Sequence, residues 1–323
     1  AIGQEPIRLE VREGSEIVGI ASAHLVPARR GHHLAIPYGP VVSKHEAFEA
    51  LLMELQKLGR AHNCSFVRLS PFWPEHARRS KLLEEQTKRS PLHLLAEHVW
   101  YLPLRSNDVW KEENSGEPRK EDEVFSNFRA TTRNLIRRAE KEGVEIVASK
   151  SPENDIQHFV RLHEETRQRH AFTPYTNSFF HEELMQFAAR GEATLYLARY
   201  QNEVIASSIH IHAFGETSYH HGASTHRFSK IPASYALQWR AIQDALNRGD
   251  HVYNFWGIAP VTFDAEGKPS IAEKKHPFAG VTLFKTGFGG KLLELSPCRD
   301  LPLNSKYHIT RAFEIVRKWK RGF

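Results

Sequence analysis

The sequence predicts an α/β protein, of the α+β kind, with two similar domains that each hold a mixed, mostly antiparallel sheet flanked by helices. The 323 residues exceed the length of one typical domain. Each half of the chain carries the same order of patterns: strand, strand, glycine-containing loop, helix, strand. A charge-dense segment without a core pattern, residues 106–123, separates the halves. Because residue identity between the halves is low, the prediction rests on pattern order.

The first half begins with alternating apolar residues on both sides of a turn at residues 13–15. A third extended stretch leads into a Tyr-Gly-Pro loop at residues 38–40. Apolar residues at helical spacing follow, and two short strands then enclose a second helix. In order, the predicted elements are strands over residues 7–11 and 17–26, a helix over 45–61, a strand over 66–69, a helix over 75–88 and a strand over 98–104 that completes this half.

Two helices, over residues 124–139 and 154–170, introduce the second half, which then repeats the plan of the first. A hairpin is expected across residues 201–202. Pro232 opens a helix that Gly249 ends, at a position that tolerates a left-handed backbone. The strands are predicted over residues 194–200, 204–212, 217–221 and 252–256, and a last helix over 306–320 is expected to bury Ile309, Ala312, Phe313 and Val316.

Composition limits the classes of partner and compartment. With 44 basic and 38 acidic residues, the chain carries a net charge of +6, which favours an anionic partner without naming one. Only Cys64 and Cys298 are present, too few for a disulfide framework or a thiolate metal site, so a reducing cytoplasm is expected. No apolar run approaches the ~20 residues that cross a bilayer, and no secretion leader is visible before Ala1.

Five short motifs occur in a characteristic order along nearly the whole chain. Residues 132–144 read TRNLIRRAEKEGV, and the others are residues 38–41 (YGPV), 219–224 (YHHGAS), 253–258 (YNFWGI) and 276–290 (HPFAGVTLFKTGFGG). They resemble the motifs of the Fem family, transferases that build peptidoglycan bridges, whose signature over the first segment is R-x-x-I-R-K-A-x-K-x-G-V. Each motif alone is weak, but five in family order are hard to obtain by chance.

The resemblance implies a pair of GNAT-like domains with a cleft between them. It also implies that the last helix returns to the first domain, which gives limits of 1–104 plus 295–323 for one domain and 105–294 for the other. Fem proteins take an amino acid from aminoacyl-tRNA and add it to an amine side chain of a UDP-linked or lipid-linked muropeptide precursor. We therefore expect a cytoplasmic aminoacyltransferase without a cofactor, and leave open a peripheral contact with the inner face of the membrane.

Aminoacyl transfer needs a positioned amine and stabilisation of the oxyanion that develops on the ester. By the resemblance, Lys285 is assigned to that oxygen or to the departing ribose, and Phe284 to stacking on the terminal adenine of the donor. We expect both on a strand; without the family context, a surface lysine would be the simpler interpretation of Lys285. The other candidates for substrate binding are Tyr38, Gly39, Pro40, Tyr219, Gly222, Lys230 and Trp256, with buried packing as an equal alternative for the two tyrosines.

Basic residues on two predicted helices are candidates for contacts with tRNA phosphates. They are Arg129, Arg133 and Arg137, which recur every four residues, together with Lys318 and Lys320 near the end of the chain. For any single one of them, a solvated helix face is the competing interpretation. Two departures from the family pattern also matter. Ser43 stands where relatives often have Asp, so no general base is assigned, and no Arg follows residues 169–175 to hold a precursor phosphate.

Other signals favour different functions less strongly. Four histidines on neighbouring predicted strands make a metal site geometrically feasible, but without a Cys or H-x-x-x-H arrangement no metal is expected; they are His210, His212, His220 and His221. Residues 287–291 lack the spacing of a phosphate loop. Two alternatives remain: an N-acyltransferase that uses acyl-CoA, although residues 222–229 lack the usual [RQ]-x-x-G-x-[GA] loop, and a non-catalytic protein that binds tRNA or the precursor.

Overall fold

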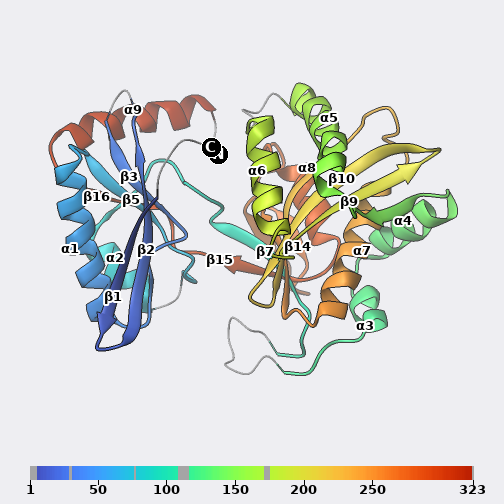
Figure 1. The fold of residues 1–323 in the computed structure, drawn as a ribbon, viewed down its shortest axis with the longest axis horizontal. Coiled ribbons are helices and arrows are strands. Elements are labelled where there is room, and N and C mark those ends of the chain that lie inside the picture. The colour runs from blue at the N-terminus through green and yellow to red at the C-terminus, as the bar shows by residue number, and fades with distance from the viewer. Residues whose placement is uncertain (1–5, 29–30, 76–77, 108–115, 171–174, 322–323) are drawn as a thin grey trace. The chain divides into compact units, whose positions relative to one another are not determined.

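Two seven-stranded sheets organise the computed structural model of this chain (Figure 1). It describes residues 6–28, 31–75, 78–107, 116–170 and 175–321. These residues divide into two compact units: the first holds residues up to 98 and from 293 onward, and the second holds residues 99–292. This division rests on which residues lie close together in space, and it does not test the predicted domain limits. The expectation of two domains with limits at 104/105 and 294/295 stays a prediction.

In the first unit, the strand order is β1-β2-β3-β5-β16-β6, and β4 pairs with β2. All neighbours are antiparallel except β3 and β5, which run parallel. The elements are β1 (Pro6–Glu13), β2 (Glu16–Val26), β3 (His33–Pro37), β4 (Val41–Val42), α1 (His45–Ala61), β5 (Phe66–Ser70), α2 (Arg78–Gln86), β6 (Lys88–Arg89), β16 (Arg299–Pro302) and α9 (Lys306–Arg321).

In the second unit, the strand order is β15-β7-β12-β11-β10-β9-β8, and a separate hairpin joins β13 to β14. Strands β11 and β12 run parallel, whereas β10 is antiparallel to both of its neighbours. The elements are β7 (His98–Pro103), α3 (Glu121–Ser126), α4 (Ala130–Lys141), β8 (Glu145–Ala148), α5 (Pro152–His170), α6 (Asn177–Ala188), β9 (Ala193–Tyr200), β10 (Glu203–Ala213), β11 (Glu216–Ser224), α7 (Ala233–Arg248), β12 (Val252–Gly257), β13 (Val261–Phe263), β14 (Pro269–Ile271), α8 (Ala279–Thr286) and β15 (Lys291–Glu294).

The sheet of the second unit separates two apolar clusters, because side chains alternate between the faces of a strand. On β9, Leu195 and Leu197 pack with residues of α5 and α6. Tyr196 and Ala198 point the other way and pack with residues of α4 and α7. The helices therefore cover the sheet on both sides (Figure 1).

Several local predictions are confirmed. The hairpin between β9 and β10 turns at Gln201 and Asn202, whose φ angles of 49° and 63° are left-handed. Gly249 follows α7 with φ 79°, the conformation expected at a helix end. The first long helix, α1, buries the predicted apolar face that includes Phe48 and Leu55. In each case the signal lies within a few residues of the feature.

Strand β7 corrects one prediction. The pattern placed residues 98–104 at the end of the first half, whereas β7 pairs antiparallel with β12 in the second sheet. Tyr101 lies opposite Asn254, and Pro103 lies opposite Val252. The apolar run of β7 is buried along almost its whole length. Such a run marks a strand inside a sheet but does not specify which sheet.

Helix α9 corrects a second prediction, because the residues expected to be buried are exposed. Ile309 is 72% exposed, and Phe313 and Val316 are also exposed; so is Ala312. The opposite side of α9 packs instead through Tyr307 and Thr310. Glu314 on that side accepts hydrogen bonds from buried Arg68 of β5. Helix α9 therefore packs through the side that carries Glu314, the partner of Arg68, and not through the apolar side that includes Ile309.

The helices of the second unit differ from the prediction in two places. The helix expected over residues 124–139 is two helices, α3 and α4, which meet at residues 127–129. Helix α6 was not predicted, although Thr176 caps it by accepting a hydrogen bond from the Phe179 amide. Among the described residues, no helix is long and apolar enough to cross a membrane.

Candidate active site

The candidate site lies where the parallel strands β11 and β12 separate. The two strands pair through only three positions, from Glu216 opposite Val252 to Ser218 opposite Asn254. Beyond them β11 continues to Ser224 and β12 to Gly257. Near the end of β12, Trp256 adopts a left-handed φ of 68°. Beyond Ser218 and Asn254 the two strands are therefore no longer paired with each other.

Lys285 extends into this separation from helix α8. Its side chain is buried, with 6% exposed. The Nζ atom donates a hydrogen bond to the Gly257 carbonyl oxygen at 2.7 Å and lies 5.8 Å from the centre of the Tyr219 ring. Burial lowers the pKa of Lys285 to about 7. The ammonium group thus contacts both separating strands and is poised to gain or lose a proton near neutrality.

The expectation that residues 284–285 form a strand, and the alternative of a surface lysine, are both wrong. α8 spans Ala279–Thr286 and turns the Lys285 side chain inward. A short apolar run such as residues 281–284 cannot be assigned to a helix or a strand by periodicity alone. Phe284 is partly buried, and its ring meets those of Tyr235 and Phe288 edge-on at 4.9 and 5.3 Å. Stacking on an adenine stays a prediction for Phe284.

Tyr219 and Gly222 act as a pair on β11. A Cβ atom placed on Gly222 would lie 1.8 Å from the Tyr219 hydroxyl oxygen, so a glycine is required for the observed position of that ring. The same ring stacks on His210, with centroids 5.4 Å apart. Burial raises the pKa of Tyr219 to about 12, so its hydroxyl keeps its proton. This contact gives the Tyr-x-x-Gly spacing a physical reason.

Buried hydrogen bonds link the residues behind Tyr219 to one another. His210 Nε2 lies 2.8 Å from the Tyr253 hydroxyl, which donates in turn to the Gln238 amide oxygen at 2.6 Å. Burial lowers the pKa of His210 to about 3, so the imidazole is neutral. His212 lies 3.1 Å from the Thr194 hydroxyl. These two histidines therefore serve hydrogen bonds within the sheet.

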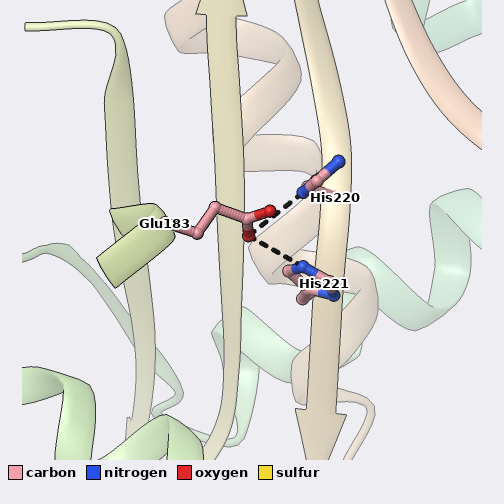
Figure 2. Close-up of side chains that lie close together, drawn as sticks. All are labelled: Glu183, His220 and His221. Carbon is pink, nitrogen blue, oxygen red and sulfur yellow. Dashed lines mark hydrogen bonds and ion pairs between the residues drawn. The ribbon is translucent and has the colours of Figure 1, made fainter. Parts of the chain in front are cut away.

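His220 and His221, by contrast, both contact a carboxylate that was not predicted from the sequence. His221 Nε2 and His220 Nδ1 lie 2.8 and 3.2 Å from the same oxygen, Oε2 of Glu183 (Figure 2). Glu183 comes from α6. The ring of His220 also packs edge-on against that of Trp256, with ring centres 5.1 Å apart. The helix cap at Thr176 and the spacing of Phe180 and Leu184 were the signals that could have placed Glu183 on a helix.

The predicted substrate-binding residues divide between the two units. In the second unit, Tyr219 lies beside Lys285 and Gly222 lies against the Tyr219 ring, while Trp256 directly precedes Gly257, whose carbonyl Lys285 contacts. Lys230 is exposed in the loop before α7, and its carbonyl accepts a hydrogen bond from Arg138. In the first unit, the loop between β3 and β4 holds Tyr38, Gly39 and Pro40. There Tyr38 has a left-handed φ of 48° and packs edge-on against Phe72, while Ser43 donates a hydrogen bond to the Val18 carbonyl.

Each arginine of the predicted tRNA-binding face makes a contact within the protein. Arg133 donates to the carbonyl oxygens of Ser126 and Phe128, so it caps the junction of α3 and α4. Arg137 lies over the ring of Phe125. Arg129 donates to the Thr286 hydroxyl at 3.3 Å. Lys318 is exposed on α9, and the side chain of Lys320 lies outside the described residues.

Arg129 also borders a basic cavity of about 430 Å³ beside α8. Its lining includes Lys268 and Lys274 together with the hydroxyl groups of Ser270, Thr282 and Thr286, and no carboxylate among the described residues contributes to it. Cations and hydroxyl donors without a compensating acid suit a phosphate group. A second cavity of about 340 Å³ lies at the start of α7, bordered by Arg138 and Lys230.

Comparison with known proteins shows what the fold and part of the sequence are similar to. Residues 126–263 match the family described as Acetyltransferase (GNAT) domain. Aminoacyltransferase FemA from Staphylococcus aureus is 36% identical over 106 residues, which is 32% of this chain and 22% of that protein. The crystal structure of FemX aligns with 97% of this chain and 91% of its own, with a TM-score of 0.77 and 17% identity. The chain has a GNAT-like fold and is similar to Fem proteins.

The prediction of tandem GNAT-like domains is confirmed. A tandem GNAT protein from the clavulanic acid biosynthesis pathway aligns with 93% of the chain and 82% of its own length, with a TM-score of 0.54 and 13% identity. L-PGS from Bacillus licheniformis aligns with 94% of this chain and 86% of its own, with a TM-score of 0.58 and 14% identity. At such identities, these structures establish the fold. The match to FemA spans about a fifth of that relative's length.

Proposed function

We propose that this protein is an aminoacyltransferase that moves an amino acid from aminoacyl-tRNA to an amine of a peptidoglycan precursor stem peptide. The observation that carries the proposal is the buried charge of Lys285 between β11 and β12, held by a carbonyl oxygen. The relative FemA, named an aminoacyltransferase, supports the class of reaction. The choice of aminoacyl-tRNA as the donor and of the precursor as the acceptor rests on the family resemblance.

In the proposed reaction, the amine nitrogen attacks the ester carbonyl of the donor, and a negative charge develops on the carbonyl oxygen. Lys285 is the cation that would stabilise this charge, a role worth a few kcal/mol for one well-placed donor. When the bond to the ribose oxygen breaks, that oxygen takes up a proton and the amine loses one. With a pKa of about 7, Lys285 is able to supply the proton to the ribose.

The basic cavity beside α8 supports the choice of a phosphate-rich donor. Arg129, Lys268 and Lys274 border it, and its wall includes Thr282 and Thr286 of the same helix that carries Lys285. We assign this cavity to a phosphate near the acceptor end of the tRNA. Arg133, which caps a helix junction, and Arg137, which lies over Phe125, keep the tRNA role only as a prediction.

The test is transfer of radiolabelled amino acids from a mixed pool of charged tRNAs to the UDP-linked and the lipid-linked precursor. Alkali-stable label on a precursor is expected, because an amide survives mild alkali that hydrolyses the donor ester. The Lys285→Ala variant should form far less of this product. Absence of any labelled precursor would contradict the proposal, and a Lys285→Ala variant as active as the wild type would remove the role of that lysine.

A second candidate is an N-acyltransferase that uses acyl-CoA. The match to the acetyltransferase domain favours it, as does the cavity at the start of α7, where Arg138 and Lys230 border a helix amino terminus that suits an anion. A thermal-shift titration separates the candidates. Stabilisation by acetyl-CoA and none by charged tRNA would favour this second function. The reverse result would favour the first.

We also propose that α9 is the site of peripheral contact with an anionic membrane surface. Its exposed face includes Ile309, Phe313, Val316 and Trp319, the last with 82% exposed. The cations Arg317 and Lys318 are exposed on the same helix. Apolar residues including a tryptophan, flanked by cations, suit the interface of a bilayer that contains acidic lipids.

Co-sedimentation with vesicles tests this contact. Binding to vesicles with phosphatidylglycerol is expected, with weaker binding to pure phosphatidylcholine. Trp319→Ser should reduce binding, whereas Met53→Ser should not, because Met53 is an exposed apolar residue on α1. Equal loss in both variants, or equal binding to the two kinds of vesicle, would contradict the assignment.

A further inference from the structure

Glu183, His220 and His221 form a compact cluster of metal-binding side chains in the second unit. Figure 2 shows both imidazoles directed at one carboxylate. The three ligand atoms lie within 4.8 Å of one another, and no other such group of three is found among the described residues. This cluster has no part in the proposed transfer reaction.

A β-bulge explains how two adjacent residues reach the same partner. Side chains of neighbouring residues on a regular strand point to opposite faces. Here His210 pairs with Tyr219 while Ile209 pairs with His221, so β11 holds one extra residue, His220, between the two pairs. The bulge re-aims a side chain, as bulges commonly do near functional sites. Both histidines therefore approach Glu183.

We propose that Glu183, His220 and His221 bind a divalent transition-metal ion, for which Zn²⁺ is the best match. Two imidazole nitrogens and one carboxylate oxygen are a common set of Zn²⁺ ligands. Around an ion with ligands at about 2.1 Å, neighbouring ligand atoms lie roughly 3.0 to 3.4 Å apart. The distances of 2.8 and 3.2 Å to Glu183 Oε2 are within a few tenths of an ångström of this range.

The surroundings combine an apolar wall with access from solvent. The ring of His221 packs edge-on against Phe180, with centroids 4.9 Å apart, and Trp256 packs against His220. Side-chain exposures of 25% for His220 and 15% for His221 leave a route for an ion. An apolar shell of this kind strengthens and tunes a metal site. Three protein ligands leave one tetrahedral position for water or for an amine or carboxylate of a ligand.

Titration of the full chain, without an affinity tag and freed of metal by a chelator, tests the site. Co²⁺ is the probe, because its visible absorption reports coordination and Zn²⁺ competes for the same ligands. One Co²⁺ per chain, displaced by Zn²⁺, is expected, together with quenching of tryptophan fluorescence through Trp256. No substrate is present, so the outcome does not depend on the proposed transferase function.

Two substitutions and one control make the test specific. His220→Ala and Glu183→Gln should each weaken binding at least about tenfold. His226→Ala is the matched control, because His226 is exposed just beyond β11 and does not belong to the cluster. Circular dichroism spectra establish that each variant is folded; His220 is the most exposed of the three ligands and the safest to replace. Wild-type binding below one equivalent, or equal weakening in the control, would overturn the proposal.

Discussion

Among the described residues, each unit buries one lysine or arginine side chain beside its pair of parallel strands, and only one of the two is paired with carboxylates. In the first unit, Arg68 of β5 donates hydrogen bonds to Asp300 and Glu314. In the second unit, Lys285 has the Gly257 carbonyl as its hydrogen-bond partner, and no ion pair joins it to a carboxylate in the described part of the chain. Arg68 is neutralised in place, whereas Lys285 is not.

The pKa values record this difference. Burial alone would lower the pKa of Arg68, but its hydrogen bonds to Asp300 and Glu314 raise it. Burial acts without such opposition on Lys285 and lowers its pKa to about 7. A charge that is fully paired holds elements together, here α9 and β16 to β5. A charge that is buried without a counter-ion costs stability and stays available to a ligand.

The strands around the two cations differ in the same sense. In the first unit, β3 and β5 pair through five positions, from His33 opposite Phe66 to Pro37 opposite Ser70. In the second unit, β11 and β12 pair through three and then separate at Tyr219. Strands β3 and β5 thus stay paired along the strand that carries Arg68. Strands β11 and β12 are no longer paired where Lys285 lies.

The largest expected effect is on the stability of the first unit. Arg68→Met leaves Asp300 and Glu314 without their partner, so the free energy of unfolding should fall by about 3–5 kcal/mol. Urea denaturation measures it, with Arg60→Met, an exposed arginine on α1, as the control. A fall in the free energy of unfolding below about 1 kcal/mol would mean that water takes the place of the arginine. It would contradict a structural role for the Arg68 ion pairs.

Lys285→Met should have the opposite outcome. Amide formation in the transfer assay is expected to fall by about 10²–10³-fold, the usual cost of one oxyanion donor. The free energy of unfolding should stay the same or rise, because an unpaired buried charge is removed. The control is Lys141→Met, at the exposed end of α4. A variant that keeps its activity but loses stability would make Lys285 a structural residue like Arg68.

Stability should depend on pH through the unpaired Lys285. The folded-state pKa of Lys285, about 7, lies below the ordinary lysine value near 10.5. Between these values the unfolded chain binds more protons than the folded one, so stability should rise with pH in this window. The contribution, taken as wild type minus Lys285→Met, should rise by at most about 1.4 kcal/mol per pH unit. Denaturation at pH 7, 8 and 9 measures it; a flat difference would contradict the lowered pKa.

The smallest expected effect concerns Gly222. In Gly222→Ala the new methyl group displaces the Tyr219 ring, which lies 5.8 Å from Lys285 Nζ. We expect transfer to fall about tenfold by misplacement, with the melting temperature little changed. Gly280→Ala is the matched control, because a Cβ on Gly280 would meet nothing within 4 Å. Equal activities would mean that the position of Tyr219 does not matter to the site.

Much of the site was visible in the sequence as motifs, but the element that carries its charge was not. Tyr219, Gly222, Trp256 and Lys285 were all singled out, and the structure groups them around the separation of β11 and β12. Lys285 was placed on a strand, although α8 carries it. Glu183 was missed altogether, because its helix was not predicted and its histidine partners lie 37 and 38 residues farther along the chain.

Features that depend on near neighbours in the chain were predicted correctly: the hairpin at residues 201–202, the end of α7 at Gly249 and the apolar face of α1. Long-range contacts, by contrast, fix the sheet to which β7 belongs, the face of α9 that packs and the charges that are paired. The reason is physical. Turn and helix signals act over a few residues, whereas burial, counter-ions and pKa values depend on groups that distant parts of the chain bring together.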